Sequence, residues 1–148
     1  MVSGARILDL IDVSYIAVCP LAYVLAGTTK LILNSLKEGH IAVRQIGLGG
    51  IPSTHTSIAS APVWLILFQD GLATPALAVA VGLLMIVAID AMDLRARLGN
   101  VHSLLKTRFP KDPEVQRLRD RVGHSPLEVA CGVIAGGVSA LVMMYVTA

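Results

Sequence analysis

The chain has 148 residues, of which 55% are hydrophobic and only 15% are charged, and its mean hydropathy is +0.73. Soluble domains carry about 25% charged residues, so this composition excludes an ordinary soluble domain and predicts an integral membrane protein. A net charge of +2, with no aromatic residues alternating with Lys and Arg, argues against nucleic-acid binding. No linker or long-period repeat divides the sequence, so we expect one domain over residues 1–148.

Four apolar segments are expected to form helices, because a bilayer core takes about 20 apolar residues to cross. They cover residues 14–36, 54–68, 76–89 and 127–146. The second follows Pro52, with Ser53 or Thr54 as its N-cap. The third is too short to cross alone and must continue into the polar stretch after it, as far as about Leu105, before a break at Pro110. The expected fold is an all-α polytopic membrane bundle of about four transmembrane helices, with a polar helix or loop region on one face.

Basic residues are distributed unevenly between the two sides that four alternating helices would define. The 37–50 loop and the 90–126 segment would emerge together, and they hold ten of the twelve Lys and Arg residues: Lys37, Arg44, Arg95, Arg97, Lys106, Arg108, Lys111, Arg117, Arg119 and Arg121. The positive-inside rule predicts that this face is cytoplasmic and that both termini lie outside. Gly132 and Gly136 on the last helix form a small-residue ridge, which allows close helix packing within the chain or between two copies.

Four ionisable residues lie where apolar sequence becomes polar, at the same end of three expected helices: His55, Asp90, His124 and Glu128. Such groups are costly at that depth and indicate function unless they pair with one another. His124 and Glu128 are four residues apart and would share a helix face. The carboxylate would then accept from one imidazole nitrogen and leave the other free to attack or to take a proton. A structural pair that caps the helix is the alternative.

A glycine-rich turn, Gly49-Gly50, precedes the helix that carries His55. Unpaired backbone N–H groups at such a turn suit an anion. Cationic side chains flank it, and they predict a phosphate site beside a histidine: Lys37, Arg44, and Arg95 or Arg97. The same cations could instead contact anionic lipid head groups.

These residues resemble the motifs of the type 2 phosphatidic acid phosphatase superfamily, which also contains vanadium haloperoxidases. Its motifs read K-x6-R-P, P-S-G-H and S-R-x5-H-x3-D, and the chain has Lys37-x6-Arg44, Pro52-Ser53-Thr54-His55 and His124-x3-Glu128 in the same order. Residues 49–57, 90–95 and 123–129 are similar to GGMPSSHSA, DAxGVRR and LGHTPxEV, the blocks of a divergent bacterial and plastid branch. The resemblance covers nearly the whole chain and identifies it as a member of this branch.

The resemblance implies a membrane phosphatase that hydrolyses a lipid phosphomonoester or pyrophosphate through a phosphohistidine. His124 would attack phosphorus, Glu128 would orient it, and His55 would protonate the leaving alcohol and then activate water. The phosphate would be bound by a larger set: Lys37, Arg44, Ser53, Thr54 and Arg95. Supporting residues would be Asp90, Arg97 and Arg121. No cofactor and no metal are implied.

The chain departs from the motifs at four positions: Gln45 replaces proline, Thr54 replaces glycine, Glu128 replaces aspartate, and Leu118 stands where the third motif has arginine. Other arginines would have to supply that charge, and among Arg95, Arg97, Arg117, Arg119 and Arg121 we favour Arg95. Without a substitute, the protein would bind phosphate without turning it over. A non-catalytic protein that binds or transports phosphorylated lipid head groups is therefore the alternative, and a structural component is a third.

Two metal-dependent interpretations are weaker. Asp90-x-x-Asp93 is similar to the metal motif of CDP-alcohol phosphotransferases, but Leu94 stands where their glycine should be. A hydrolytic metal site built from His55, Asp90, His124 and Glu128 lacks a recognised ligand spacing. The expected setting is a bacterial inner membrane or a plastid-type membrane, with the lipid bilayer and a lipid phosphate substrate as partners and with a homo-oligomer as one arrangement.

Overall fold

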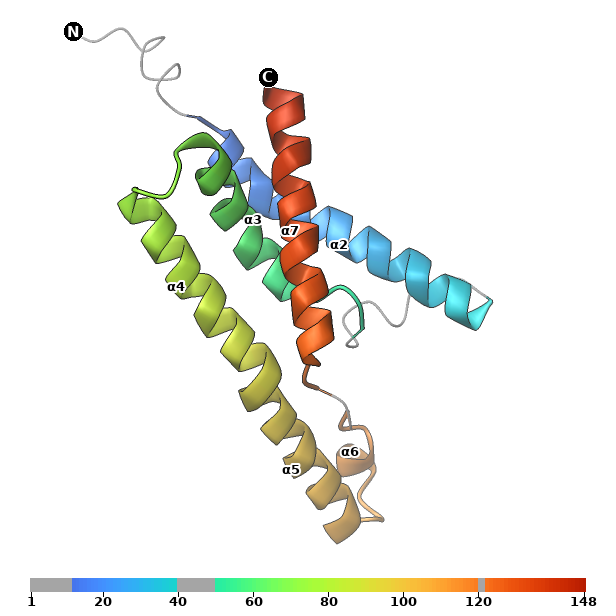
Figure 1. Cartoon of the computed structure of the whole chain (residues 1–148). Helices are drawn as coiled ribbons and strands as arrows, with labels where there is room; N and C mark the ends of the chain where they lie inside the picture. The colour runs from blue at the N-terminus through green and yellow to red at the C-terminus, as the bar shows by residue number, and fades with distance from the viewer. Residues whose placement is uncertain (1–11, 40–49, 120–121) are drawn as a thin grey trace, which may run out of the picture.

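The computed structural model describes residues 12–39, 50–119 and 122–148, and all the regular secondary structure in these ranges is helical. The elements in chain order are α2 (Ser14–Glu38), α3 (Thr54–Gln69), α4 (Pro75–Ile89), the π-helix η2 (Asp90–Leu94), α5 (Arg95–Arg108), α6 (Pro113–Gln116) and α7 (Pro126–Thr147). Figure 1 shows α4, η2 and α5 as one continuous rod. The all-α prediction is therefore confirmed for the described residues.

Three helical segments are long and apolar enough to cross a membrane: Ser14–Lys37, Pro75–Arg108 and Pro126–Thr147. The second of these includes the polar continuation that the sequence required. The fourth expected crossing, α3, has 16 residues, which is about 24 Å at 1.5 Å per residue, against a hydrocarbon core of about 30 Å. A fourth full crossing therefore stays a prediction.

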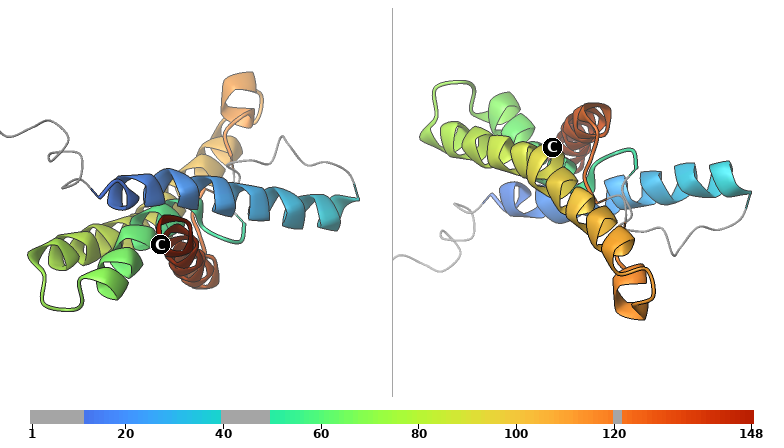
Figure 2. Two further views of the ribbon diagram at one scale, coloured as in Figure 1. Left: turned by 90° about the horizontal axis from the view of Figure 1, so that it is seen from above. Right: turned by 90° about the horizontal axis from the view of Figure 1, so that it is seen from below.

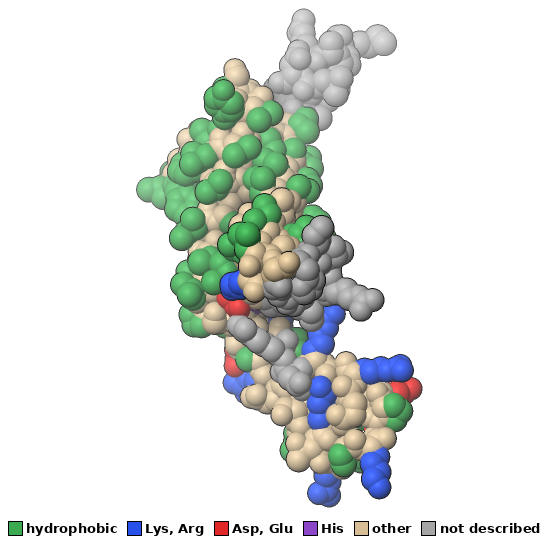
Figure 3. Space-filling view, turned by 90° about the vertical axis from the view of Figure 1, so that its right-hand side faces the viewer, with side chains coloured by type: hydrophobic (Ala, Val, Ile, Leu, Met, Phe, Trp, Pro, Cys, Tyr) green, Lys and Arg blue, Asp and Glu red, His purple; other side chains and the backbone are tan. Residues whose placement is uncertain are grey.

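The helices alternate in direction, so that three chain segments meet at one end of the bundle. Figure 1 shows that α3 and α7 begin near the point where α4 passes into η2, while the start of α2 and the end of α7 lie toward the other end. In Figure 3 apolar side chains cover the upper body, and Lys and Arg gather on the lower lobe. His55 lies in the first turn of α3, Asp90 at the junction of α4 and η2, and His124 just before α7, so the residues that the sequence selects belong to the segments that meet at this end.

Small and hydroxylated side chains fill the interior of the bundle. Ser57, Ser60 and Ser139 are completely buried, whereas Val79 on α4 is 74% exposed and Ile134 on α7 is 66% exposed. A water-soluble bundle buries its large apolar side chains and exposes its polar ones. The reversed distribution is typical of helices that pack through small residues and face lipid with large ones.

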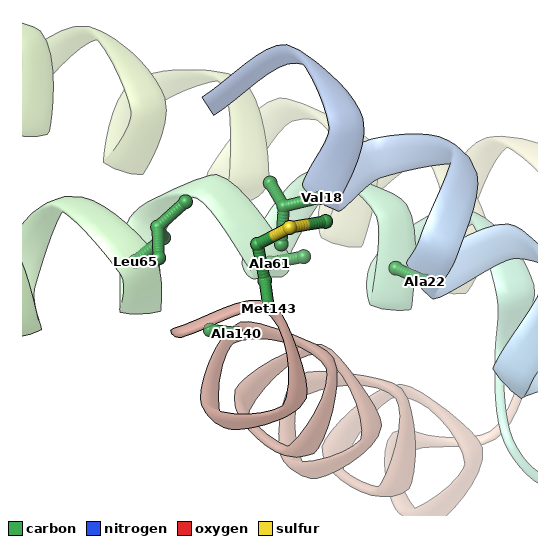
Figure 4. Close-up of a cluster of buried hydrophobic side chains, with 6 residues drawn as sticks. All are labelled: Val18, Ala22, Ala61, Leu65, Ala140 and Met143. Carbon is green, nitrogen blue, oxygen red and sulfur yellow. The ribbon is translucent and has the colours of Figure 1, made fainter. Parts of the chain in front are cut away.

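The apolar core lies where α2, α3 and α7 meet. Figure 4 shows the six buried side chains of this cluster, two from each helix: Val18, Ala22, Ala61, Leu65, Ala140 and Met143. Figure 2 shows α2 crossing the other helices obliquely, and α2 is in contact with both α3 and α7. α3 therefore lies between α2, α4 and α7.

The glycine ridge of α7 packs against α3. A Cβ atom on Gly132 would lie 2.7 Å from the carbonyl oxygen of Ser53, and one on Gly136 would lie 2.8 Å from that of Ser57. Trp64 Nε1 on α3 also donates to the carbonyl of Val133 on α7 at 3.0 Å. The close approach predicted for the ridge is confirmed. Because α3 of the same chain occupies it, pairing of two copies would need another surface.

Candidate active site

His124 and Glu128 form a buried pair at the start of α7. His124 Nδ1 lies 3.2 Å from Glu128 Oε2, and the two side chains are only 6% and 5% exposed. An ionised carboxylate can only accept, so Nδ1 carries the hydrogen and Nε2 has a free lone pair. The arrangement therefore leaves one imidazole nitrogen able to act as a nucleophile or a base.

The same carboxylate also caps α7. Glu128 Oε2 accepts from the backbone N–H of the N-cap residue Ser125 at 2.8 Å, and Ser125 Oγ accepts from the N–H of Glu128 at 3.3 Å. This is a reciprocal capping box. The capping interpretation and the catalytic interpretation of the pair are therefore compatible, because one carboxylate makes both contacts.

Glu128 also holds the turn that leads into α3. Its Oε1 accepts from the N–H of Gly50 at 3.0 Å, and its backbone carbonyl accepts from the N–H of Ser53 at 3.0 Å. Gly50 has φ +98°, a left-handed conformation that favours glycine. The turn is thereby fixed to α7, which brings His55, the second residue of α3, to the same end of the bundle as His124.

The π-helix η2 also makes a backbone hydrogen bond to the segment that carries His124. The N–H of Arg95 bonds to the carbonyl of Asp90, five residues back, so the hydrogen-bond ladder is locally out of α-helical register. The carbonyl of Ala91, within this segment, accepts from the N–H of His124 at 2.9 Å. Short π-helical turns inside α-helices frequently mark functional sites. Here the irregular turn anchors the backbone of the buried histidine.

Gly123 allows the approach of this loop to α5. A Cβ atom at this position would lie 2.8 Å from the backbone nitrogen of Ala96. The segment before α7 therefore lies directly against the junction of η2 and α5.

Arg95 and Asp90 form an ion pair beside His55. Arg95 Nε lies 2.8 Å from Asp90 Oδ2, and each side chain is about one third exposed, at 32% and 35%. Both line a cavity of about 420 Å³ that is otherwise mostly apolar and runs between α2, α3 and α4; its lining residues are Cys19, His55, Ile58, Ala59, Pro62, Leu83, Ile86, Val87, Asp90 and Arg95. The cavity thus has a polar end, at His55 and Arg95, and an apolar length.

The charges of the site act on both histidines. Burial lowers the pKa of His124, the positive charges of Lys30 and Arg95 lower it further, and Glu128 opposes these effects. His124 is therefore neutral at neutral pH. Burial also lowers the pKa of His55, and the charges of Arg95, His124 and Lys30 lower it further, so the two imidazoles lie within electrostatic reach of each other. His124 itself lines a smaller, more polar cavity of about 310 Å³ against Ala96 and Asn100 of α5.

A family model described as the divergent PAP2 family matches residues 11–139, which include all of these residues. The chain belongs to the divergent PAP2 family. The branch identified from the sequence motifs is thereby confirmed. Neither the curated proteins nor the solved structures include a significant match.

In this divergent PAP2 chain, the predicted phosphate-binding residues have different environments. Ser53 is completely buried, and its hydroxyl is the N-cap of α3, 3.4 Å from Thr56 N and 2.9 Å from Thr56 Oγ1. Thr54 is partly exposed at the first position of α3, and Lys37 is exposed in the last turn of α2. Arg44 lies outside the described residues. Of the described cations in this predicted set, Arg95 is the one whose charge acts on both histidines.

The three residues predicted to support the site also differ in their positions. Asp90 lines the cavity beside His55. Arg97 is exposed on α5 and paired with Asp93 at 2.8 Å, away from the cavity. Arg121 lies outside the described residues. Among the described His, Cys, Asp and Glu side chains, no group of three is arranged to hold a metal ion.

Sequence reasoning missed Lys30 as a site residue. This lysine, in α2, is only 4% exposed, and its charge acts on His55 and His124. The available signal was its position, because a lysine inside an apolar span is costly and indicates function. The contacts of the Gly50 N–H and the Ala91 carbonyl had no comparable sequence signal.

Proposed function

We propose that this divergent PAP2 protein is a membrane phosphatase that hydrolyses a lipid phosphomonoester or pyrophosphate without a metal. The buried His124–Glu128 pair carries the proposal, because its geometry prepares Nε2 of a neutral imidazole for nucleophilic attack. Family membership supports phosphatase-like chemistry. The nearby positive charge of Arg95 supports an anionic substrate.

The reaction proceeds in two balanced steps. Nε2 of His124 forms a bond to phosphorus while the bond from phosphorus to the leaving oxygen breaks, and His55, which the negative charge of the bound phosphate brings into its protonated form, gives that oxygen a proton. His55, now neutral, then takes a proton from water as the water oxygen attacks the phosphohistidine, and the N–P bond breaks to release inorganic phosphate. Glu128 holds the Nδ1 hydrogen of His124 throughout and stabilises the positive charge that develops on the ring.

A lipid substrate fits the position of the site. The cavity beside His55 has Arg95 and Asp90 at one end and apolar residues of α3 and α4 along its length, which suits a phosphate head group joined to an apolar chain. The phosphate would be held by Arg95 with Lys37, Arg44 and Thr54. The site would open to the cytoplasm, as the distribution of basic residues predicts.

The test uses purified protein in detergent, with a diacyl phosphomonoester and a polyprenyl pyrophosphate as substrates, in the presence of a chelator. Wild-type protein should release phosphate, orthovanadate should inhibit it, and His124→Ala should reduce turnover at least a thousandfold. His102→Ala is the matched control, because His102 lies on α5 and contacts the carbonyl of Arg119 instead of the site. Full turnover by His124→Ala would refute the nucleophile, and loss of activity on chelation would refute a metal-independent reaction.

A second function is favoured by one observation. Leu118 stands six residues before His124, where the superfamily motif has arginine, and Arg97 is turned to Asp93. If no other cation completes the site, the protein binds or transports a phosphorylated lipid head group without hydrolysing it. Tight orthovanadate binding without turnover of either substrate would favour this function over the phosphatase.

A further inference from the structure

One face of α2 is buried from Ser14 to Lys30. Ser14, Val18, Ala22, Ala26 and Lys30 recur at intervals of four residues, and all five are at most 4% exposed. Residues four apart share one side of an α-helix. Val18 and Ala22 on this stripe pack against α3 and α7, so Lys30 continues the same face two turns further along, toward the start of those helices.

Burying an ammonium group is costly unless an anion or several acceptors compensate it. In the described residues, Lys30 forms neither a hydrogen bond nor an ion pair. Among the described residues, Ser14 Oγ is the one fully buried side-chain N or O atom that lacks a hydrogen bond, so the ammonium nitrogen of Lys30 keeps some accessible surface. The chain therefore keeps a cation with an accessible tip on the packed face of α2, although a methionine of similar length would fill that space at lower cost.

The groups that interact electrostatically with Lys30 belong to the candidate active site. The carboxylate of Glu128 acts on it electrostatically, and Lys30 in turn acts on both histidines. Glu128 does not neutralise it by a direct contact, because its two oxygens are already hydrogen-bonded to Gly50, Ser125 and His124. No described residue therefore occupies the three N–H donors of the ammonium group, which are open to an external acceptor.

We infer that Lys30 binds the phosphate group of the substrate and supplies the positive charge that the sequence lacks at Leu118. This inference rests on the proposed function, and it extends that function by adding a cation from α2 to the cation that Arg95 supplies. Lys30 and Arg95 then approach the phosphoryl oxygens from two sides, while His124 approaches phosphorus. The acceptor is a phosphoryl group, either on a lipid or as free phosphate.

The experiment compares wild type, Lys30→Met, Lys30→Arg and the control Lys111→Met, which removes an exposed lysine between α5 and α6. Binding of orthovanadate and of inorganic phosphate is measured by titration in detergent, and turnover is measured with the lipid substrates above. Lys30→Met should weaken orthovanadate binding at least tenfold and lower kcat/KM at least a hundredfold. Lys30→Arg should recover part of both, and Lys111→Met should match wild type. Weaker binding of the lipid substrate with unchanged binding of free phosphate would assign the contact to the lipid head group alone.

Thermal unfolding separates this inference from a structural explanation. If the Lys30 ammonium group has no direct partner until the ligand binds, Lys30→Met should unfold at the same temperature as wild type or a higher one, because a cation on the packed face is replaced by an apolar side chain. A lower unfolding temperature together with unchanged orthovanadate binding would overturn the inference and make Lys30 a structural partner of Glu128. If wild type binds orthovanadate but has no turnover, the phosphatase fails while Lys30 is still tested by binding. If wild type does neither, both are refuted.

Discussion

Replacing Glu128 by Gln tests the contact on which the site geometry depends. Glu128 is 4% exposed, and its oxygens accept from Gly50 N, Ser125 N and His124 Nδ1. A glutamine has one oxygen and one NH2 group, so in either orientation its NH2 faces at least one donor. If the NH2 group faces the N–H of Gly50, one hydrogen bond is lost. If the NH2 group faces Ser125 N and His124 Nδ1, two hydrogen bonds are lost.

Hydrogen bonds to a charged group contribute about 1.5–3 kcal/mol each, and the orientation with the smaller loss will be adopted. We therefore expect Glu128→Gln to lower the free energy of unfolding by about 2–3 kcal/mol. Its effect on turnover should be larger than its effect on stability, because the neutral amide no longer stabilises a positively charged His124 ring. Glu128→Asp keeps the charge and should retain more turnover than Glu128→Gln.

Unfolding can be followed in mixed micelles with increasing SDS, using the fluorescence of Trp64, the single tryptophan, which contacts α7 through Val133. The matched control is Glu114→Gln on α6, where the residue is exposed, and a change below about 0.5 kcal/mol is expected there. Equal stability of the two variants would refute the reasoning, because it would mean that the carboxylate of Glu128 does not hold the Gly50 turn and α7 together.

Two further predictions concern packing and pH. Gly136→Ala should destabilise the chain by about 1–3 kcal/mol, because its Cβ would lie 2.8 Å from the carbonyl oxygen of Ser57. The control Gly82→Ala should be neutral or stabilising, because no atom lies within 4 Å of the added Cβ. Equal effects of the two variants on stability in SDS titrations would contradict this prediction. Burial lowers the pKa of His124 in the folded chain. As the pH falls below the usual histidine pKa of about 6.5, the unfolded chain therefore takes up a proton before the folded chain does. The stability of the fold should decrease over this range, until the pH reaches the lower pKa of the folded state. His124→Asn should remove this part of the pH dependence, and an unchanged profile would show that another group causes it.

The helices were predictable because length and capping decide them. The apolar run of the last span and the Ser125-Pro126 start fix α7, and Ser53 begins α3 as an N-cap should. The extension of α4 through η2 into α5 also followed, because an apolar run of about one half to two thirds of a bilayer cannot end inside lipid. The sequence did not settle whether α3 crosses the whole membrane, since an apolar helix of 16 residues fits both a short crossing and a buried central helix.

The site was only partly predictable because motifs name side chains and not backbone contacts. The sequence placed His55, Asp90 and His124 at the ends of three helices, but it did not indicate that His55 and Asp90 would line one cavity and His124 another. The π-turn at Asp90 was not foreseeable, because one extra residue per turn leaves no periodic trace over five residues. Lys30 was passed over in favour of Lys37, whose spacing to Arg44 fits the motif, although Lys37 is exposed and Lys30 is buried.

The three motif blocks are also the three places where the helices are interrupted at the edge of the apolar body. Backbone N–H and C=O groups that leave a helix near lipid must find partners within the protein. Here they find one another: Gly50 and Ser53 bond to Glu128, and His124 bonds to Ala91 of the π-turn. The same bonds that make these breaks tolerable near lipid therefore fix the positions of both histidines. A substitution that restores a regular helix at any one block should consequently loosen the other two, even where it removes no side chain of the site.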